Sequence, residues 1–151
     1  YLKQHEPKLS SSELLDRVAD ALEMVGLKDT QKKMPSELSG GMRKRAALAR
    51  LIVYRPQILL YDEPTTGLDP ITSMQINDLI NQIKEELKAT SIVVTHDIRS
   101  ALEVGDRMAF HNEGKSSYVA PKYEFLHSDK PDLKEFFSHA VIDSHQFEKY
   151  S

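Results

Sequence analysis

Hydrophobic positions along the chain follow two alternating spacings, and the alternation predicts a succession of helices and strands. Apolar residues that recur every three or four positions mark one face of a helix, whereas a short continuous apolar run marks a buried strand. Strands and helices in alternation, followed by a hairpin, predict an α/β architecture with a largely parallel sheet. Helices are predicted at 10–25, 39–55, 69–87, 97–104, 122–127 and 132–140, and strands at 58–61, 91–95, 107–111 and 117–120.

Several of the predicted helices begin at a residue that can cap them. Ser10 and Glu13 have the spacing of a capping box, and Asp69 precedes a proline that suits a first helical turn. Gly26 is predicted to end the first helix, because glycine tolerates the left-handed conformation found at helix ends. The polar stretch 28–37 is predicted to be a loop.

Polar side chains follow the two central strands. Asp62 and Glu63 come directly after the first apolar run, and His96 follows the second. Ligands of open α/β sheets bind beyond the carboxyl ends of strands. There one carboxylate can hold Mg²⁺ through water, a second can orient an attacking water, and a histidine can contact a phosphate oxygen. The alternative is that the two acids merely begin a loop.

Two adjacent glycines stand at the predicted start of another helix. Gly40 and Gly41 follow Ser39, and glycine lets a backbone approach a ligand closely. The first amide groups of a helix favour an anion, so this segment suits a phosphate group. The alternative is an ordinary N-cap formed by Ser39.

Composition narrows the class of protein. The 151 residues suit one domain or part of a larger one, and 40% hydrophobic with 28% charged residues is typical of a globular protein. A net charge of −3 argues against a nucleic-acid-binding protein held by bulk charge. The absence of cysteine excludes disulfides, thiolate zinc sites and cysteine nucleophiles. No apolar run approaches the roughly 20 residues of a membrane-spanning helix.

Four motifs occur in an order that is far more specific than any one of them. Residues 38–45 (LSGGMRKR) resemble the signature motif of ABC-type ATPases, and 58–64 (ILLYDEP) resemble their Walker B strand and catalytic glutamate. Residues 66–69 (TGLD) resemble the D-loop, and 95–97 (THD) the switch-histidine motif. The resemblance covers about 14–137 and implies a P-loop NTPase-like ABC ATPase core with a helical subdomain.

The resemblance also implies roles for individual residues, with ATP and Mg²⁺ as cofactors. Ser39 and the two glycines after it would contact the γ-phosphate of an ATP held mainly by an opposite subunit, and Asp69 would couple the two sites of the dimer. Many family members have glutamine where this chain has Met42, so a side-chain amide is lost there. The implied ATP-binding residues are Ser39, Gly40, Gly41, Met42 and Asp69, the catalytic residues Glu63 and His96, and the Mg²⁺ residue Asp62.

The family's phosphate-binding loop, G-x-x-x-x-G-K-[ST], does not occur in these residues. Since the first residue is Tyr1 rather than Met, we expect a fragment whose loop lies upstream, and we expect this polypeptide alone to be inactive. The expected division is a partial helical subdomain at 1–56, the catalytic core at 57–120, and C-terminal helices with a tail at 121–151.

For the intact subunit, the resemblance implies a homodimeric ATPase that powers transport through an integral-membrane permease. It would act at the cytoplasmic face of the inner or plasma membrane. Residues 35–37 and 40–50 most resemble Mla-type lipid transporters, so MCE-type or other substrate-binding proteins are further expected partners, with no nucleic acid. Three alternatives stay open: an amino-acid or small-solute importer, a non-catalytic ABC-derived partner-binding protein, and an ABC ATPase acting on DNA or ribosomes.

Overall fold

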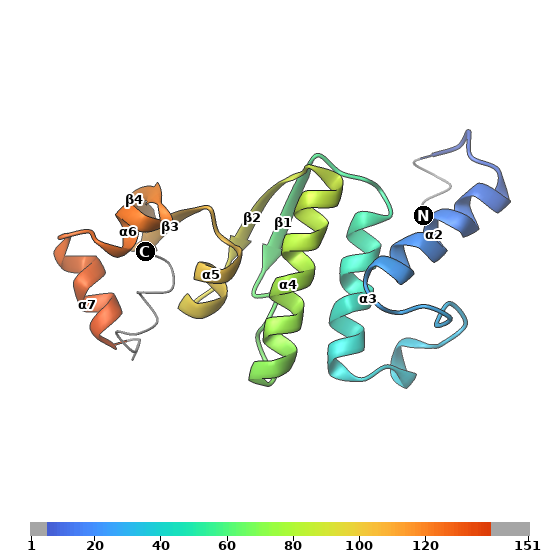
Figure 1. Cartoon of the computed structure of the whole chain (residues 1–151), viewed down its shortest axis with the longest axis horizontal. Coiled ribbons are helices and arrows are strands. Elements are labelled where there is room, and N and C mark those ends of the chain that lie inside the picture. The colour runs from blue at the N-terminus through green and yellow to red at the C-terminus, as the bar shows by residue number, and fades with distance from the viewer. Residues whose placement is uncertain (1–5, 140–151) are drawn as a thin grey trace. The chain divides into compact units, whose positions relative to one another are not determined.

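The computed structural model describes residues 6–139, which fall into two compact units, one ending at Val94 and the other beginning at Thr95 (Figure 1). The predicted α/β succession is confirmed, whereas the predicted tail beyond 139 lies outside the described residues. None of the described helices has the length and apolarity to cross a membrane. The first unit holds α2 (Ser11–Met24), the 3₁₀-helix η1 (Pro35–Glu37), α3 (Gly40–Ile52), β1 (Ile58–Asp62), α4 (Pro70–Leu87) and β2 (Thr90–Val94). The second holds α5 (Ile98–Val104), β3 (Arg107–Asn112), β4 (Lys115–Pro121), α6 (Lys122–Leu126) and α7 (Pro131–His139).

The predicted start and end of α2 are confirmed. The Ser10 amide donates to Glu13 Oε2 at 2.7 Å, and the Glu13 amide donates to Ser10 Oγ at 3.3 Å, which completes the capping box. Gly26, with a φ of 68°, ends the helix in the left-handed region. The loop predicted at 28–37 is wrong in its last part, because η1 forms there around a bond from the Met34 amide to Glu37 Oε2 at 2.6 Å.

Strands β1 and β2 pair in parallel, as predicted, with Leu59 opposite Ser91 and Tyr61 opposite Val93. Leu59 and Tyr61 share one face of β1 and are only 1% and 4% exposed. Helices α3 and α4 run side by side next to this strand pair in Figure 1. They complete the core of the unit with the buried residues Leu48, Ala49, Ile52, Ile76, Leu79, Ile80 and Ile83.

The expectation that both central strands are buried is wrong for one face of the sheet. Ile58 and Leu60 on β1, with Ile92 and Val94 on β2, are between 53% and 67% exposed. Residues 58–61 and 92–94 are apolar at every position, as in sheets covered on two sides. Within the described first unit, helices cover only the face that carries Leu59, so alternate apolar positions remain exposed.

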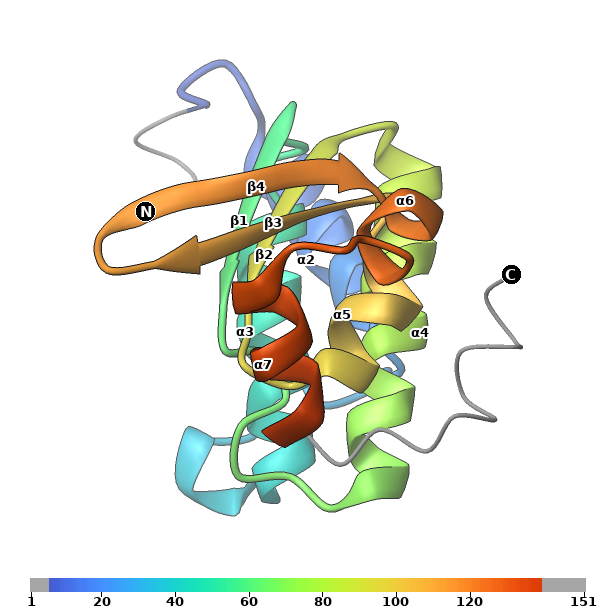
Figure 2. The same cartoon turned by 90° about the vertical axis from the view of Figure 1, so that its left-hand side faces the viewer.

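The second unit is built on the predicted hairpin. Strands β3 and β4 are antiparallel, with an irregular register at Phe110 and a turn at Gly114, whose φ is 75°. Figure 2 shows the hairpin extending as a ribbon, with α6 at its end. Its core is Ala120, Phe125 and Leu133, with Met108, Phe110, Tyr118 and Phe137 packed around them.

Two isoleucines of α4 allow the packing of the first unit to be tested. Ile83 is completely buried, whereas Ile71 on the first turn is 71% exposed. We expect Ile83→Ala to lower the free energy of unfolding by about 2–5 kcal/mol, because it opens a cavity in the core. Ile71→Ala should change it by no more than about 0.5 kcal/mol. Urea unfolding measures both, and equal losses would contradict the packing described.

Candidate functional site

The carboxyl ends of β1 and β2 meet at the candidate site. Asp62 lies opposite Val94, and the Glu63 amide donates to the Val94 carbonyl at 2.9 Å, which continues the strand pairing by one residue. Glu63 then adopts a φ of 47°, which is uncommon for a residue other than glycine. The chain therefore turns sharply after the strand, leaving Asp62 exposed and Glu63 half-buried.

The direction of the Glu63 carboxylate is fixed by the turn that follows. Thr66 Oγ1 donates to Glu63 Oε2 at 2.9 Å, and the Thr66 amide donates to the Glu63 carbonyl at 3.3 Å. From α3, Lys44 Nζ donates to the same carbonyl at 3.4 Å. Sequence reasoning assigned no role to Thr66, although a hydroxyl residue three positions after an acid in a turn is the signal that could have found it.

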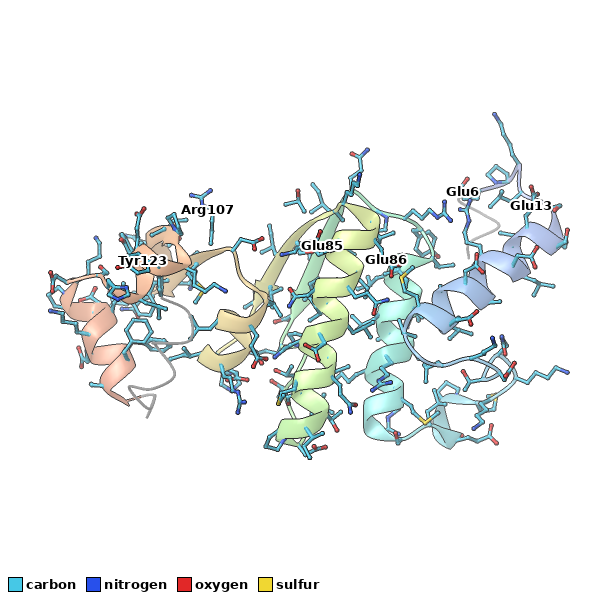
Figure 3. The ribbon with its side chains drawn as sticks, viewed as in Figure 1. Glu6, Glu13, Glu85, Glu86, Arg107 and Tyr123 are labelled. Atoms are coloured by element: carbon cyan, nitrogen blue, oxygen red, sulfur yellow. The ribbon has the colours of Figure 1, made fainter. Side chains whose placement is uncertain are left out.

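A second pair of adjacent acids shows why the position of the first pair matters. Glu85 and Glu86 lie near the C-terminal end of α4, where Figure 3 labels them. Both are exposed, and the Gln82 side-chain amide donates to Glu86 Oε1 at 2.8 Å. Neighbouring residues on a helix point in different directions. These two carboxylates therefore belong to a solvated helix face, unlike the pair at the end of β1.

Ser39 is the N-cap of α3, as the alternative of an ordinary N-cap predicted. Ser39 Oγ accepts a hydrogen bond from the Met42 amide at 3.2 Å. Gly40 and Gly41 form the first helical positions, where backbone amides are oriented outward and the helix dipole favours an anion. An N-cap and a phosphate contact are compatible at one helix start. The ATP contacts expected of Ser39, Gly40, Gly41 and Met42 stay a prediction.

Asp69 is the N-cap of α4. Its carboxylate accepts from the Thr72 amide at 3.0 Å and from the Thr72 hydroxyl at 2.5 Å. Two hydrogen bonds hold the pKa of Asp69 below its usual value: the bond from the Thr72 hydroxyl has the larger effect and the bond from the Thr72 amide the smaller. Because the pKa of Asp69 is lower in the folded state, the ionised carboxylate stabilises the fold at neutral pH. This stabilisation is lost as pH falls through the pKa of the folded state. The coupling role expected of Asp69 stays a prediction.

His96 belongs to the second unit, in the turn before α5. Its imidazole is exposed. The turn is held by the Asp97 amide, which donates to Thr95 Oγ1 at 3.0 Å, and by the Ser100 hydroxyl, which donates to Asp97 Oδ2 at 2.6 Å. The other predicted residues, from Ser39 to Asp69, all lie in the first unit. The expected contact of His96 with a phosphate stays a prediction.

The described residues suit ATP and Mg²⁺ in two respects. Between 6 and 139 there is no group of three or more histidine, aspartate or glutamate side chains that could enclose a metal. Mg²⁺ bound to a nucleotide needs only one or two carboxylates beside phosphates and water, which the exposed Asp62 can supply. At Gly40, the nearest heavy atom to a built Cβ is Arg43 Nη2 at 4.0 Å, so the start of α3 is open to an approaching anion.

The parallel strand pair, with its carboxylates at the strand end and its glycine-initiated helix, is an arrangement of the P-loop ATPase class of α/β folds. The family model described as "ABC transporter" matches residues 2–66. A "Probable ribonucleotide transport ATP-binding protein mkl" from Mycobacterium leprae is 41% identical over 91% of this chain. The chain belongs to the ABC transporter family of ATP-binding domains.

A relative from Arabidopsis thaliana and a solved structure extend the comparison. "Protein TRIGALACTOSYLDIACYLGLYCEROL 3, chloroplastic" is 38% identical over 90% of this chain. The ATP-binding cassette MJ0796, in a dimeric post-hydrolysis state bound to ADP and Pi, superposes with a TM-score of 0.64. It is 34% identical and covers 75% of this chain. The chain spans 39% of the length of the mycobacterial relative, 44% of the plant relative and 49% of the cassette.

Two serine caps separate the stability of a helix start from a role in binding. Ser39 and Ser10 cap α3 and α2 in the same way, but only Ser39 lies in the signature motif. We expect Ser39→Ala and Ser10→Ala each to lower the free energy of unfolding by about 1 kcal/mol. Only Ser39→Ala should also weaken ATP-dependent dimerisation of the intact subunit. Unfolding and analytical ultracentrifugation measure the two effects, and equal dimerisation in both variants would assign Ser39 to capping alone.

Proposed function

We propose that this chain carries the signature, Walker B, D-loop and switch segments of a subunit that hydrolyses ATP to power an ABC transporter. The observation that carries the proposal is the carboxylate of the half-buried residue Glu63 at the carboxyl end of β1, oriented by the Thr66 hydroxyl. A carboxylate held in one direction is what activation of a water for phosphoryl transfer needs. The organisation proposed is a partial helical subdomain at 1–56, a core at 57–120 and C-terminal helices from 121.

In this proposal, bound ATP supplies the phosphoryl group and Mg²⁺ supplies charge neutralisation. Glu63 orients the attacking water, and His96 contacts the γ-phosphate, while Asp62 holds the ion through water. The start of α3 presents the Ser39 hydroxyl and the amides of Gly40 and Gly41 to the phosphate of the ATP held by a second subunit. Met42, whose amide donates to Ser39 Oγ, completes the ATP-binding segment. Asp69 lies at the D-loop end next to that helix start. The chemistry is mainly positioning and charge stabilisation.

The proposed assembly is a homodimer that acts on a membrane permease from the cytoplasmic side. The superposed cassette is dimeric, which supports the dimer. In this dimer each signature helix faces the nucleotide of the other subunit. The signature segment and the carboxylate of Glu63, which lie in the same unit of one chain, therefore serve two different nucleotides. Accessory substrate-binding or MCE-type proteins belong to the proposal as further partners.

Lipid is the proposed cargo, and a small solute is the alternative. The plant relative, 38% identical, is named after a glycolipid, which supports lipid. The mycobacterial relative is named for ribonucleotide transport, and others are named for transport of spermidine and putrescine, amino acids and methionine. These names differ although the identities to this chain are similar, and in this proposal the permease and its accessory proteins select the cargo. Cargo uptake into vesicles with the native permease distinguishes the two.

Replacement of the catalytic carboxylate tests the proposal. We expect Glu63→Gln in the intact subunit to lower kcat for ATP hydrolysis by at least about a hundredfold, because the water loses its orienting base. ATP binding and dimer formation should persist. The matched control is Glu86→Gln, since Glu86 is an exposed carboxylate on α4, and its kcat should stay unchanged.

The outcomes of this test separate the alternatives. Hydrolysis by Glu63→Gln at the normal rate would show that another group activates the water. An intact wild-type subunit that binds its permease but hydrolyses no ATP would favour the non-catalytic, partner-binding alternative. Stimulation by DNA or ribosomes in place of a permease would favour an ABC ATPase that acts on DNA or ribosomes.

The hydrogen bond from Thr66 is tested separately. Thr66→Val removes the hydroxyl and keeps the shape, whereas Thr66→Ser keeps the hydroxyl. We expect Thr66→Val to lower kcat about tenfold, at the lower end of what a hydrogen bond to a charged group contributes, because the contact is exposed. The KM for ATP should not change, and Thr66→Ser should retain most of kcat. Equal losses in both variants would show that the hydroxyl does not orient the carboxylate.

A further inference from the structure

The two signature glycines differ in their surroundings. A Cβ built on Gly41 lies 3.0 Å from the Cγ2 methyl of Thr72, on the first turn of α4. A Cβ built on Gly40 meets only the end of the Arg43 side chain, at 4.0 Å. Neither glycine has a positive φ, so backbone conformation does not require glycine at either position. Contact with α4 therefore supplies a reason for glycine at 41 that does not apply at 40.

The Thr72 methyl cannot easily move away from Gly41. Thr72 is half-buried, and a β-branched side chain has few allowed rotamers. Its hydroxyl donates to Asp69 Oδ2 at 2.5 Å, while its amide donates to Asp69 Oδ1 at 3.0 Å. Rotation of the methyl would break the hydroxyl's bond to the carboxylate. An added Cβ at 41 must therefore be accommodated by separating the starts of α3 and α4.

The contact continues for a turn along both helices. Arg45 Nη2 on α3 donates to Gln75 Oε1 on α4 at 2.6 Å. Gly41 and Arg45 are four residues apart and Thr72 and Gln75 are three apart, so the two helices begin at the same end and run in the same direction (Figure 1). The signature helix start and the end of the D-loop are thus held together within one subunit.

We propose that Thr72 is a positioning residue, which packs against Gly41 and so fixes the signature segment relative to Asp69. The proposal rests on the proposed function, in which Ser39 and the glycines contact ATP across the dimer. A displacement of the D-loop end is then transmitted to the phosphate-contacting helix start. Glycine at 41 sets the spacing of these two segments, whereas Gly40 faces the ligand.

Four variants of the intact subunit test the spacing: Gly41→Ala, Thr72→Ser, the double variant, and Gly40→Ala as matched control. Thr72→Ser deletes the methyl and keeps the hydroxyl that Asp69 accepts. We expect Gly41→Ala to lower kcat/KM by about five- to tenfold, because the added Cβ displaces the helix starts by a few tenths of an ångström and a misplacement of about 1 Å costs on the order of a hundredfold. The double variant should recover to within about threefold of Thr72→Ser, since the added Cβ then has room. Thr72→Ser should not rescue the control Gly40→Ala.

The midpoint of thermal unfolding without nucleotide gives a readout that is independent of hydrolysis. We expect Gly41→Ala to lower the midpoint and Thr72→Ser to restore it, whereas Gly40→Ala should not lower it. A double variant as impaired as Gly41→Ala in both measurements would overturn the proposal. If the wild-type subunit hydrolyses no ATP, the proposed function fails while the unfolding rescue still decides whether the spacing exists. Unfolding rescue without recovery of kcat/KM in an active enzyme would reduce the contact to packing and also overturn the proposal.

Discussion

The geometry of the candidate site depends on one hydrogen bond, from the Glu63 amide to the Val94 carbonyl. It carries the parallel pairing of β1 and β2 one residue beyond the end of the strands. The chain can then turn at once, at the cost of a left-handed backbone at Glu63 of about 1–2 kcal/mol. Without that bond, the backbone of Glu63 would be held only through its carbonyl, by the Thr66 amide and Lys44 Nζ, and its carboxylate would be placed less firmly for the Thr66 hydroxyl.

Helix caps provide the second level of order, and they are made by the residues that the family motifs share. Ser39 caps α3, Asp69 caps α4 and Asp97 caps α5, so three motif residues each satisfy backbone amides of the following helix. A capping side chain has a fixed direction and leaves the later amides of the first turn oriented outward. At Ser39 and Asp69 the proposed chemical roles therefore fall on residues that also cap a helix, and a substitution there would affect both.

Much of the fold could be predicted from the sequence because its determinants are local. Capping residues gave the start of α2 and of α4, and continuous apolar runs gave β1 and β2 to within one residue. Exposure of Leu60 and Ile92 could not be predicted, because burial depends on which layers cover a sheet and not on the strand's own residues. The candidate site residues were predicted from the order of four motifs, and their roles stay a prediction. The contact of Gly41 with Thr72 was not found, because it joins positions that only helix packing brings together.

The exposed apolar face of the β1–β2 pair has a consequence for folding energetics. Ile58, Leu60, Ile92 and Val94 gain little hydrophobic free energy within the first unit, although they lie on its two paired strands. The free energy of these side chains is available only when another layer covers them. A polar replacement on this face would therefore cost the first unit little, and would instead weaken the binding of any layer that covers these side chains.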